Sequence, residues 1–450
     1  MDEVINELIE RGLRLSCKYG ASEAELYGVK ESITTVRGDK EGVKDSVAGD
    51  RLIVGVRVTI GKKVVTQGGI ISRLNELDYI VERAVKVVKT LPEDSNWLSL
   101  PRKLSSSNTN LEIAQEIKCP DFNRIIDLNN YLVTRANELD KRVFVSDIHT
   151  HLVYFERFIA NTYGEVLNEQ GTRAFISASV KAIENGWESG YTEYYSGTSL
   201  TKFDPEHLIG KATEIAVKTL RAKRVQTGMY EVIMAPKVFK YVFEDLLIPA
   251  FCADNIQRNR SPLKGKLEHE VFSKELTVFD DGIQPSMSGT KGFDDEGVPT
   301  TRKCLIDKGV IKNHLYDNYT ANIDRLKSTG NAFRSTPSNS PSPWRLNIIV
   351  DSGNEDLTTL IKTTRKGLIV YDVIGLWLSN PVNGLLNATV ANGMLIEEGE
   401  ERYPVKGVIL SGNIYELLKQ ENFLLTANKE NYGTYILPYA YLPKTSVAGL

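Results

Sequence analysis

Short hydrophobic runs that alternate with polar residues fill much of this chain, and glycines separate them at close intervals. A two-residue hydrophobic period is typical of strands with one buried face, and glycine is common in the tight turns between antiparallel strands. The pattern therefore predicts short antiparallel strands joined by tight turns. Between residues 24 and 69 the runs read AELYGV, ITTVRG, GVKDSVAG, RLIVGVRVTI and KKVVTQGG.

Helical spacing of apolar residues interrupts this pattern in the first half of the chain. Gly20 is expected to end the first helix and Pro92 the second, since proline cannot continue a helix. Pro205 is expected at the first position of the last of these helices, with Asp204 as its capping residue. The predicted helices cover residues 4–15, 74–91, 122–140 and 205–224.

The second half of the chain is richer in strand patterns. It opens with a strand at 230–234 and a helix at 237–250 that Pro249 interrupts. The run CLIDKGVI predicts a hairpin with Lys308 and Gly309 at its tip. Further strands that end in glycine are predicted in LNIIVDSG, GLIVYDVIG, LLNATVANG and VKGVILSG.

These patterns predict an α+β fold with two domains. Residues 1–225 are expected to form an N-terminal α/β domain of helices and antiparallel strands, and residues 226–450 a domain dominated by antiparallel sheet. The boundary is placed in the basic, polar stretch RAKRVQTG at 221–228.

Composition limits the classes of function. The 450 residues include 55 Lys and Arg against 58 Asp and Glu, a net charge of −3, which excludes a bulk basic field for nucleic acid. The N-terminus reads as an acidic amphipathic helix, whereas a secretory signal has a basic start and an apolar stretch. The apolar run at 367–378 is too short to span a bilayer and contains Asp372. We expect a cytoplasmic protein without nucleic-acid or membrane partners.

Common catalytic signatures are missing from the sequence. It has no phosphate-binding glycine loop of either usual type and no G-x-S-x-G nucleophile elbow. His149 and His151 alternate, which on a strand places both rings on one face as a metal pair would need, but no third ligand is near. The interpretation favoured here is two exposed strand residues. Residues 268–270, Glu-His-Glu, are read as a solvated charged stretch.

Longer motifs identify a family. The segment GASEAELYGVKESITTVRGDKEGVKDSVAGDRLIVGVRV resembles the N-terminal module of the TldD/PmbA family, and LPEDSNWLSLP is similar to it as well. The second half continues the likeness through ELTVFDDG, FDDEGVPTTRKCLIDKGVIKNHLYDNYTA and STGNAFR. The order and spacing of D-x-E-G-x-P, T-x-R, L-I-x-x-G-V and T-G-N-x-x-R are specific, and the likeness spans essentially the whole chain.

The resemblance also implies which kind of subunit this is. TldD-type subunits carry H-E-x-x-x-H on a helix and a cysteine near the C-terminus, which together bind zinc. Counted back without gaps from DDG at 280–282, Glu244 replaces the first histidine, Asp245 the catalytic glutamate and Pro249 the second histidine. No cysteine follows Cys304. The chain therefore resembles the PmbA/TldE kind, with no catalytic residue or cofactor of its own and zinc expected in a TldD-type partner.

The remaining acidic pair, Glu244 and Asp245, could at best form an oxygen site suited to calcium or magnesium. The favoured interpretation is two polar positions on an amphipathic helix, and the sequence does not decide whether they bind a cation.

The resemblance implies that two subunits enclose a chamber in which unfolded or extended peptides are cut. The loop at 328–345, STGNAFRSTPSNSPSPWR, is a candidate lining element, and its prolines favour an extended backbone. The candidate peptide contacts in this loop are Thr329, Asn331, Arg334 and Arg345.

Two other functions stay open at this point. One is a homodimeric protein that binds extended peptides without hydrolysing them. The other is an autonomous peptidase with an unrecognised site, which is disfavoured because the sequence offers neither a nucleophile signature nor a metal cluster. Whether the chain is an enzyme by itself is therefore not decided by its sequence.

Overall fold

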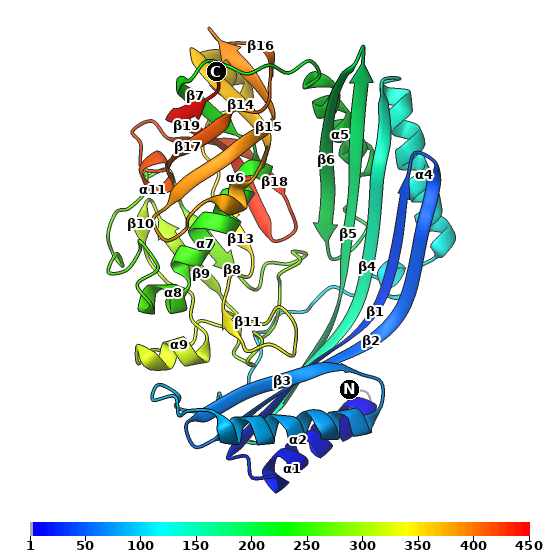
Figure 1. Cartoon of the computed structure of the whole chain (residues 1–450), viewed down its shortest axis with the longest axis vertical. Coiled ribbons are helices and arrows are strands. Elements are labelled where there is room, and N and C mark those ends of the chain that lie inside the picture. Colours follow the sequence, from blue (N-terminus) through cyan, green and yellow to red (C-terminus); the bar gives the residue numbers. More distant parts are fainter. Residues whose placement is uncertain (1–2) are drawn as a thin grey trace.

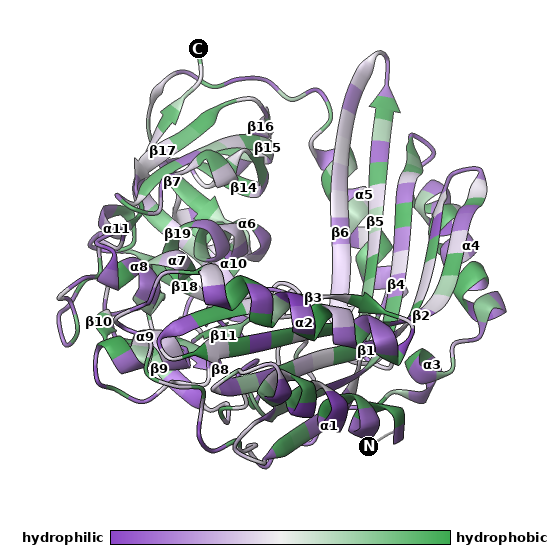
Figure 2. Cartoon of the chain, turned by 60° about the horizontal axis from the view of Figure 1, so that its bottom comes forward, coloured by the Kyte–Doolittle hydropathy of each residue, from purple (hydrophilic) through white to green (hydrophobic). Residues whose placement is uncertain are grey.

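The computed structural model describes residues 3–450, and two large sheets face each other in it (Figure 1). The first is a six-stranded antiparallel sheet in the order β3-β2-β1-β4-β5-β6. Hydrophobic and hydrophilic residues alternate along β4 and β5, as expected of a sheet with two different faces (Figure 2). Its strands are β1 (Glu23–Asp39), β2 (Gly42–Ile60), β3 (Lys63–Ile71), β4 (Val143–Asn161), β5 (Val166–Glu184) and β6 (Trp187–Gly197).

The strands of this sheet are longer than predicted. Runs that the sequence divides at glycines join into β1, with 17 residues, and β2, with 19. Gly28 lies inside β1, where a Cβ atom would overlap the ring of Phe158 on the neighbouring β4. This glycine permits a close approach between a backbone and an aromatic ring. The break predicted between the runs AELYGV and ITTVRG was wrong, since both lie in β1.

The predicted helices of the first half are confirmed, with small shifts at their ends. Asp204 caps the last of them by accepting a hydrogen bond from the Nα–H of His207 at 3.0 Å, and this helix ends at Lys218, not at 224. A short helix at 115–118 was not predicted. The helices are α1 (Glu3–Lys18), α2 (Leu74–Thr90), α3 (Gln115–Lys118), α4 (Phe122–Leu139) and α5 (Pro205–Lys218).

The second sheet has eleven strands, mostly antiparallel, with β13 parallel to β19 and β14 parallel to β7. Strands β9 and β10 form the predicted hairpin, whose turn contains Lys308 and Gly309. The strands are β7 (Gly228–Met234), β8 (Val278–Asp281), β9 (Arg302–Asp307), β10 (Val310–Ile311), β13 (Ile348–Val350), β14 (Lys366–Ile374), β15 (Leu385–Glu397), β16 (Glu400–Val405), β17 (Ile409–Asn413), β18 (Leu424–Asn431) and β19 (Tyr435–Ala448).

Several short elements cover this sheet and complete the second half. Strands β11 (Ala332–Phe333) and β12 (Ser342–Pro343) pair with each other outside the main sheet. The helical elements are α6 (Pro236–Val242), η1 (Phe243–Leu247), α7 (Ile248–Phe251), α8 (Ala253–Gln257), α9 (Asn318–Ile323), α10 (Leu357–Thr363), η2 (Leu376–Leu378) and α11 (Ile414–Leu417).

The predicted α+β class is confirmed by this arrangement. Strands β1–β6 end before residue 198, and β7 begins the second sheet at Gly228. The domain boundary at 225/226 stays a prediction. None of the helices within residues 3–450 has both the length and the apolar character needed to cross a membrane.

Candidate functional site

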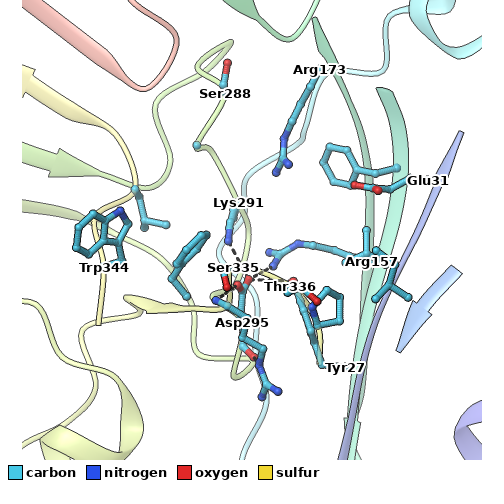
Figure 3. A pocket seen from close by; sticks show the side chains of 18 of the residues that line it. Tyr27, Glu31, Arg157, Arg173, Ser288, Lys291, Asp295, Ser335, Thr336 and Trp344 are labelled. Carbon is cyan, nitrogen blue, oxygen red and sulfur yellow. Dashed lines mark hydrogen bonds and ion pairs between the residues drawn. The ribbon is translucent and has the colours of Figure 1, made fainter. Parts of the chain in front are cut away.

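A cavity of about 820 Å³ lies between the first sheet and the loops of the second half. The sheet contributes residues from β1, β2, β4 and β5, and Figure 3 shows several of them facing the loops across the cavity. The first wall consists of Tyr27, Val29, Glu31, Arg51, Ile53, Phe155, Arg157 and Arg173. The second wall consists of Glu244, Ser288, Gly289, Lys291, Asp295, residues 333–337 and 344–346, and Thr434.

Strand register explains why the first wall is continuous. Val29 pairs with Ile53 on one side and with Arg157 on the other. Two residues along β1, Glu31 pairs with Arg51 and Phe155 in the same way. Side chains two apart on a strand, and those of directly paired residues, point to the same face, so this row faces the second half of the molecule.

Glu244, which the family resemblance assigns to the first histidine of the zinc motif, lies in the second wall of the cavity. Arg345 donates from Nε and Nη2 to its Oε2 atom at 2.8 and 2.7 Å, and the hydroxyl of Tyr435 donates to the same oxygen. Burial raises the pKa of Tyr435, which keeps this hydroxyl protonated. The Glu244 carboxylate is therefore neutralised by a cation that belongs to the protein itself.

The helix predicted at 237–250 is divided by a π-helical turn, η1, which contains both Glu244 and Asp245. Pro249 follows it in α7. A proline ring clashes with the carbonyl four residues earlier, here that of Asp245, and the wider π turn relieves this clash. Asp245 is half-buried and does not line the cavity, and burial raises its pKa.

The residues at this position do not fit a zinc ion. A structural or catalytic zinc site needs at least three nitrogen, sulfur or carboxylate donors from the protein. Within residues 3–450 there is no cluster of three or more His, Cys, Asp and Glu side chains that could hold a metal. The guanidinium of Arg345 moreover occupies the space beside Glu244, where a second cation would be repelled.

The loop at 328–345 is only partly buried: residues 330–332, 334, 337 and 343 are buried, whereas Phe333 and four others are exposed. Asn331 donates from Nδ2 to Asp280 at 2.7 Å, and Thr329 donates to Asn331 at 2.7 Å. Arg334 is almost completely buried and forms an ion pair with Glu25. Of the four candidate peptide contacts, Arg334 and Arg345 line the cavity, whereas Thr329 and Asn331 do not.

Glycines in the first sheet make room for this loop. Gly55 on β2 pairs with Gly68 on β3, and a Cβ atom on Gly55 would overlap the carbonyl oxygen of Pro337. A Cβ atom on Gly68 would lie 2.8 Å from that of Ser338. The loop therefore packs directly on the backbone of the sheet, and its residues 333–337 line the cavity.

Buried ion pairs join the two halves beside the cavity, and the sequence analysis did not predict them. Arg57 on β2 donates to Glu25 and to Glu296 at 2.7 Å each. Asp295 accepts from Arg157 at 3.0 Å and from Tyr27 at 3.0 Å. Asp295 and Glu296 both belong to the D-x-E-G motif of the family. The motif was recognised in the sequence, but the ion pairs that its residues form were not predicted.

Asp295 stays ionised in this network. Burial would raise its pKa, but Lys291 at 2.8 Å and Arg157 lower it further, and the resulting pKa is about 2. A charged carboxylate at the junction of the two halves is thus held by cations from both of them.

Two smaller cavities continue the first one along the gap between the sheets. A cavity of about 330 Å³ shares Glu244, Arg345 and Thr434 with it. A third, of about 540 Å³, shares Tyr194 and Tyr432 with the second. We call this row of three cavities the interdomain channel.

Of the five histidines, His207 lines the third cavity, and the other four are absent from the walls of all three. His149 and His151 share one face of β4 with ring centroids 5.8 Å apart, as predicted. They are half-buried, not exposed, because His149 packs on Phe175 at 6.0 Å. His269 lies between two exposed glutamates, which confirms a solvated stretch.

Comparison with known proteins gives consistent matches over most of the chain. Residues 116–220 match the PmbA/TldA metallopeptidase central domain, and residues 227–449 match the PmbA/TldA metallopeptidase C-terminal domain. A protein of Methanocaldococcus jannaschii described as uncharacterized is 28% identical, over 92% of this chain and 93% of its own. A metalloprotease of the same organism is 25% identical, over 87% of this chain and 86% of its own.

A solved structure shares the fold. TldE from Thermococcus kodakarensis superimposes with a TM-score of 0.90 and 22% sequence identity, covering 98% of this chain and 100% of that one. At this identity the likeness establishes the fold and nothing about partners or substrates.

Proposed function

This chain belongs to the PmbA/TldA metallopeptidase family, and we propose that it is a non-catalytic subunit of the PmbA/TldE kind. In this proposal it assembles with a zinc-bearing TldD-type subunit, and the pair hydrolyses unfolded or extended peptides. The zinc, the activated water and the general base belong to the partner.

The single observation that carries the proposal is the ion pair of Glu244 with Arg345. In this proposal Glu244 stands where the family's zinc subunits place their first histidine. Arg345 and Tyr435 both donate to its Oε2 atom, which could otherwise face a metal. Peptide hydrolysis of this type needs a metal that polarises the carbonyl and activates water. A guanidinium can donate hydrogen bonds, but it cannot bind a water molecule and lower its pKa as a metal ion does.

The interdomain channel supports a role in holding peptides. Its largest cavity, about 820 Å³, falls in the size range of ligand sites and combines apolar side chains with nine charged ones. Phe155, Phe333 and Trp344 supply apolar surface for side chains. An extended peptide segment, bound with little dependence on its sequence, is a suitable occupant.

An exposed apolar surface supports assembly. Large apolar side chains gather around the η2 turn and the ends of the strands beside it, and Trp377 is 72% exposed. Large exposed apolar side chains that gather in one region mark interaction sites in soluble proteins. We call these residues the η2 patch: Ile374, Trp377, Leu378, Val382, Leu385 and Ile409.

Mixing tests the proposal directly. The purified chain, a TldD-type subunit and their mixture are incubated with an unfolded protein and with short peptides, and cleavage is followed by mass spectrometry. We expect cleavage by the mixture only, and a single complex of both chains by light scattering. Cleavage by this chain alone would support an autonomous peptidase, and a homodimer that binds peptides but never joins a TldD-type subunit would support the second alternative.

The η2 patch gives this test a control. Replacing Trp377 and Leu378 by serine should prevent the complex without unfolding the chain, since both side chains are mostly exposed. Replacing the similarly exposed Tyr79 by serine, on α2 at the far end of the molecule, should leave the complex intact.

A further inference from the structure

One basic side chain in the wall of the 820 Å³ cavity has no hydrogen-bond or ion-pair partner among residues 3–450. The wall contains six basic side chains and three acidic ones. Each acid is already paired with a basic residue. The pairs are Glu31 with Arg51 (2.6 Å), Glu244 with Arg345 (2.7 Å), and Asp295 with Arg157 (3.0 Å) and Lys291 (2.8 Å).

The remaining two basic residues differ from each other. Arg334 is paired with Glu25 behind the wall. Arg173, on β5, lies over the ring of Phe155 with its guanidinium carbon 4.5 Å from the centroid. Its side chain has neither a hydrogen bond nor an ion pair within the described part of the chain. Burial lowers its pKa, and the nearby charge of Arg157 lowers it further.

Lys291 faces Arg173 from the opposite wall. Figure 3 shows Arg173 reaching from the sheet toward Lys291. An ammonium group has three donors, and among the residues described here Asp295 is the only acceptor for them. Burial lowers the pKa of Lys291 in spite of this ion pair. Both cations therefore lie in a place where an additional anion would stabilise them.

Asp295, the acid next to Lys291, does not prevent an anion from binding beside the two cations. Asp295 already accepts hydrogen bonds from Tyr27, Arg157 and Lys291. Its negative charge is offset by two cations, so an incoming anion meets a surplus of positive charge on the side of Arg173.

We propose that Arg173 and Lys291 form a carboxylate-binding site that anchors a peptide in the interdomain channel, by its C-terminal carboxylate or by an acidic side chain. The inference deepens the proposed function and rests on it for the class of ligand. A planar guanidinium matches the two oxygens of a carboxylate, and Lys291 adds a third donor. The rings of Phe155, Phe333 and Trp344 lie beside the site and suit an aromatic residue next to the carboxylate.

Calorimetric titration of the isolated chain with three peptides tests this site. The first is N-acetyl-alanyl-alanyl-phenylalanine with a free carboxylate, the second is its C-terminal amide, and the third is the amide with glutamate at the central position. We expect the second to bind about tenfold more weakly than at least one of the others, since it lacks a carboxylate to accept charge-assisted hydrogen bonds. The stronger of the other two identifies the source of the carboxylate. Equal affinity of all three, or no binding by any of them, overturns the site.

Variants assign the effect to Arg173. Arg173→Met should remove the preference for the carboxylate, and Arg124→Met, at a guanidinium that is 86% exposed on α4, should keep it. Removing an unpaired, partly buried charge should leave the melting temperature of Arg173→Met equal or higher, which excludes unfolding as the cause. An unchanged preference in folded Arg173→Met contradicts the proposal.

The two proposals fail in different ways. If the mixed subunits cleave peptides and the carboxylate makes no difference to binding, the site is wrong and the proposed function stands. If the carboxylate preference is found and depends on Arg173 but no TldD-type subunit supports cleavage, the site stands and the function is wrong.

Discussion

Two nitrogens of Arg345 donate to one carboxylate oxygen of Glu244, at 2.8 and 2.7 Å, across 101 positions of sequence. Tyr435 donates to the same oxygen. The side chains of Arg345 and Glu244 are 13% and 31% exposed, so the pair is only partly screened by water. The Glu244 carboxylate is thus held by an internal ion pair and a tyrosine hydroxyl.

Breaking one side of this pair should destabilise the protein more than removing both. Arg345→Met leaves a partly buried carboxylate without its cation and should cost about 2 kcal/mol in the free energy of unfolding. The double variant Glu244→Gln/Arg345→Met should recover most of this loss, since the amide oxygen of the introduced glutamine still accepts from Tyr435. Urea unfolding of both single variants and the double variant measures the coupling, and strictly additive effects would show that the ion pair contributes no stability of its own.

Restoring the family's zinc motif should not restore a zinc site. The variant Glu244→His/Asp245→Glu/Pro249→His supplies two imidazoles, but it lacks a third ligand and keeps Arg345 beside the site. Metal analysis after equilibrium dialysis should find well below one zinc per chain. The same variant with Arg345→Ala is the matched comparison, because it removes the competing cation. One tightly bound zinc in the triple variant would contradict this view of the site.

The sequence predicted those features that depend on neighbouring residues. The helix capped by Asp204 and the hairpin at Lys308 and Gly309 follow from local spacing, and both were confirmed. Counting back from DDG at 280–282 assigned Glu244 to the first histidine of the zinc motif; this assignment stays a prediction, and in the fold Glu244 lies in the cavity wall. Arg345 was named as a peptide contact, and its pairing with Glu244 could not be read from the sequence because only the folded chain brings the two together.

Glycine did not always mark the end of a strand: Gly49, which closes the predicted run GVKDSVAG, lies inside β2. A glycine in a hydrophobic run marks either a turn or a close approach, and the two look alike in one sequence. Gly28 makes room for the ring of Phe158, and Gly55 for the carbonyl of Pro337. Both contacts involve residues far away in the chain, so neither could be foreseen.

The contact at Gly55 predicts a specific sensitivity to a methyl group. Gly55→Ala would force Pro337 and its loop away from the sheet and should lower the free energy of unfolding by about 1–3 kcal/mol. Gly69→Ala is the control, because a Cβ atom there meets no heavy atom within 4 Å, and it should be neutral or slightly stabilising. The midpoints of urea unfolding measure both. Equal midpoints for the two variants would mean that the loop is not held against the sheet.

The buried acids beside the interdomain ion pairs predict a pH dependence. Asp317 caps α9 by accepting from the Nα–H of Thr320 at 2.8 Å. Burial, and then the charge of Glu296, raise the pKa of Asp317 to about 7. The ordinary aspartate pKa is 3.8, so between these values the folded protein holds a proton that the unfolded chain has released. The stability contributed by this group is therefore lost as the pH rises from about 4 to about 7.

Asp317→Asn removes this dependence and keeps a good capping residue, since asparagine accepts the same backbone hydrogen bond. Relative to the natural protein, the variant should gain about 1–2 kcal/mol of stability between pH 5 and pH 8. Asp356→Asn is the matched control: Asp356 caps α10, and hydrogen bonds from Thr359 lower its pKa, so its ionisation is complete by pH 5. Its difference from the natural protein should stay constant over this range. Urea unfolding at pH 5, 6.5 and 8 compares the three proteins, and a constant difference for Asp317→Asn would show that Asp317 is ionised throughout.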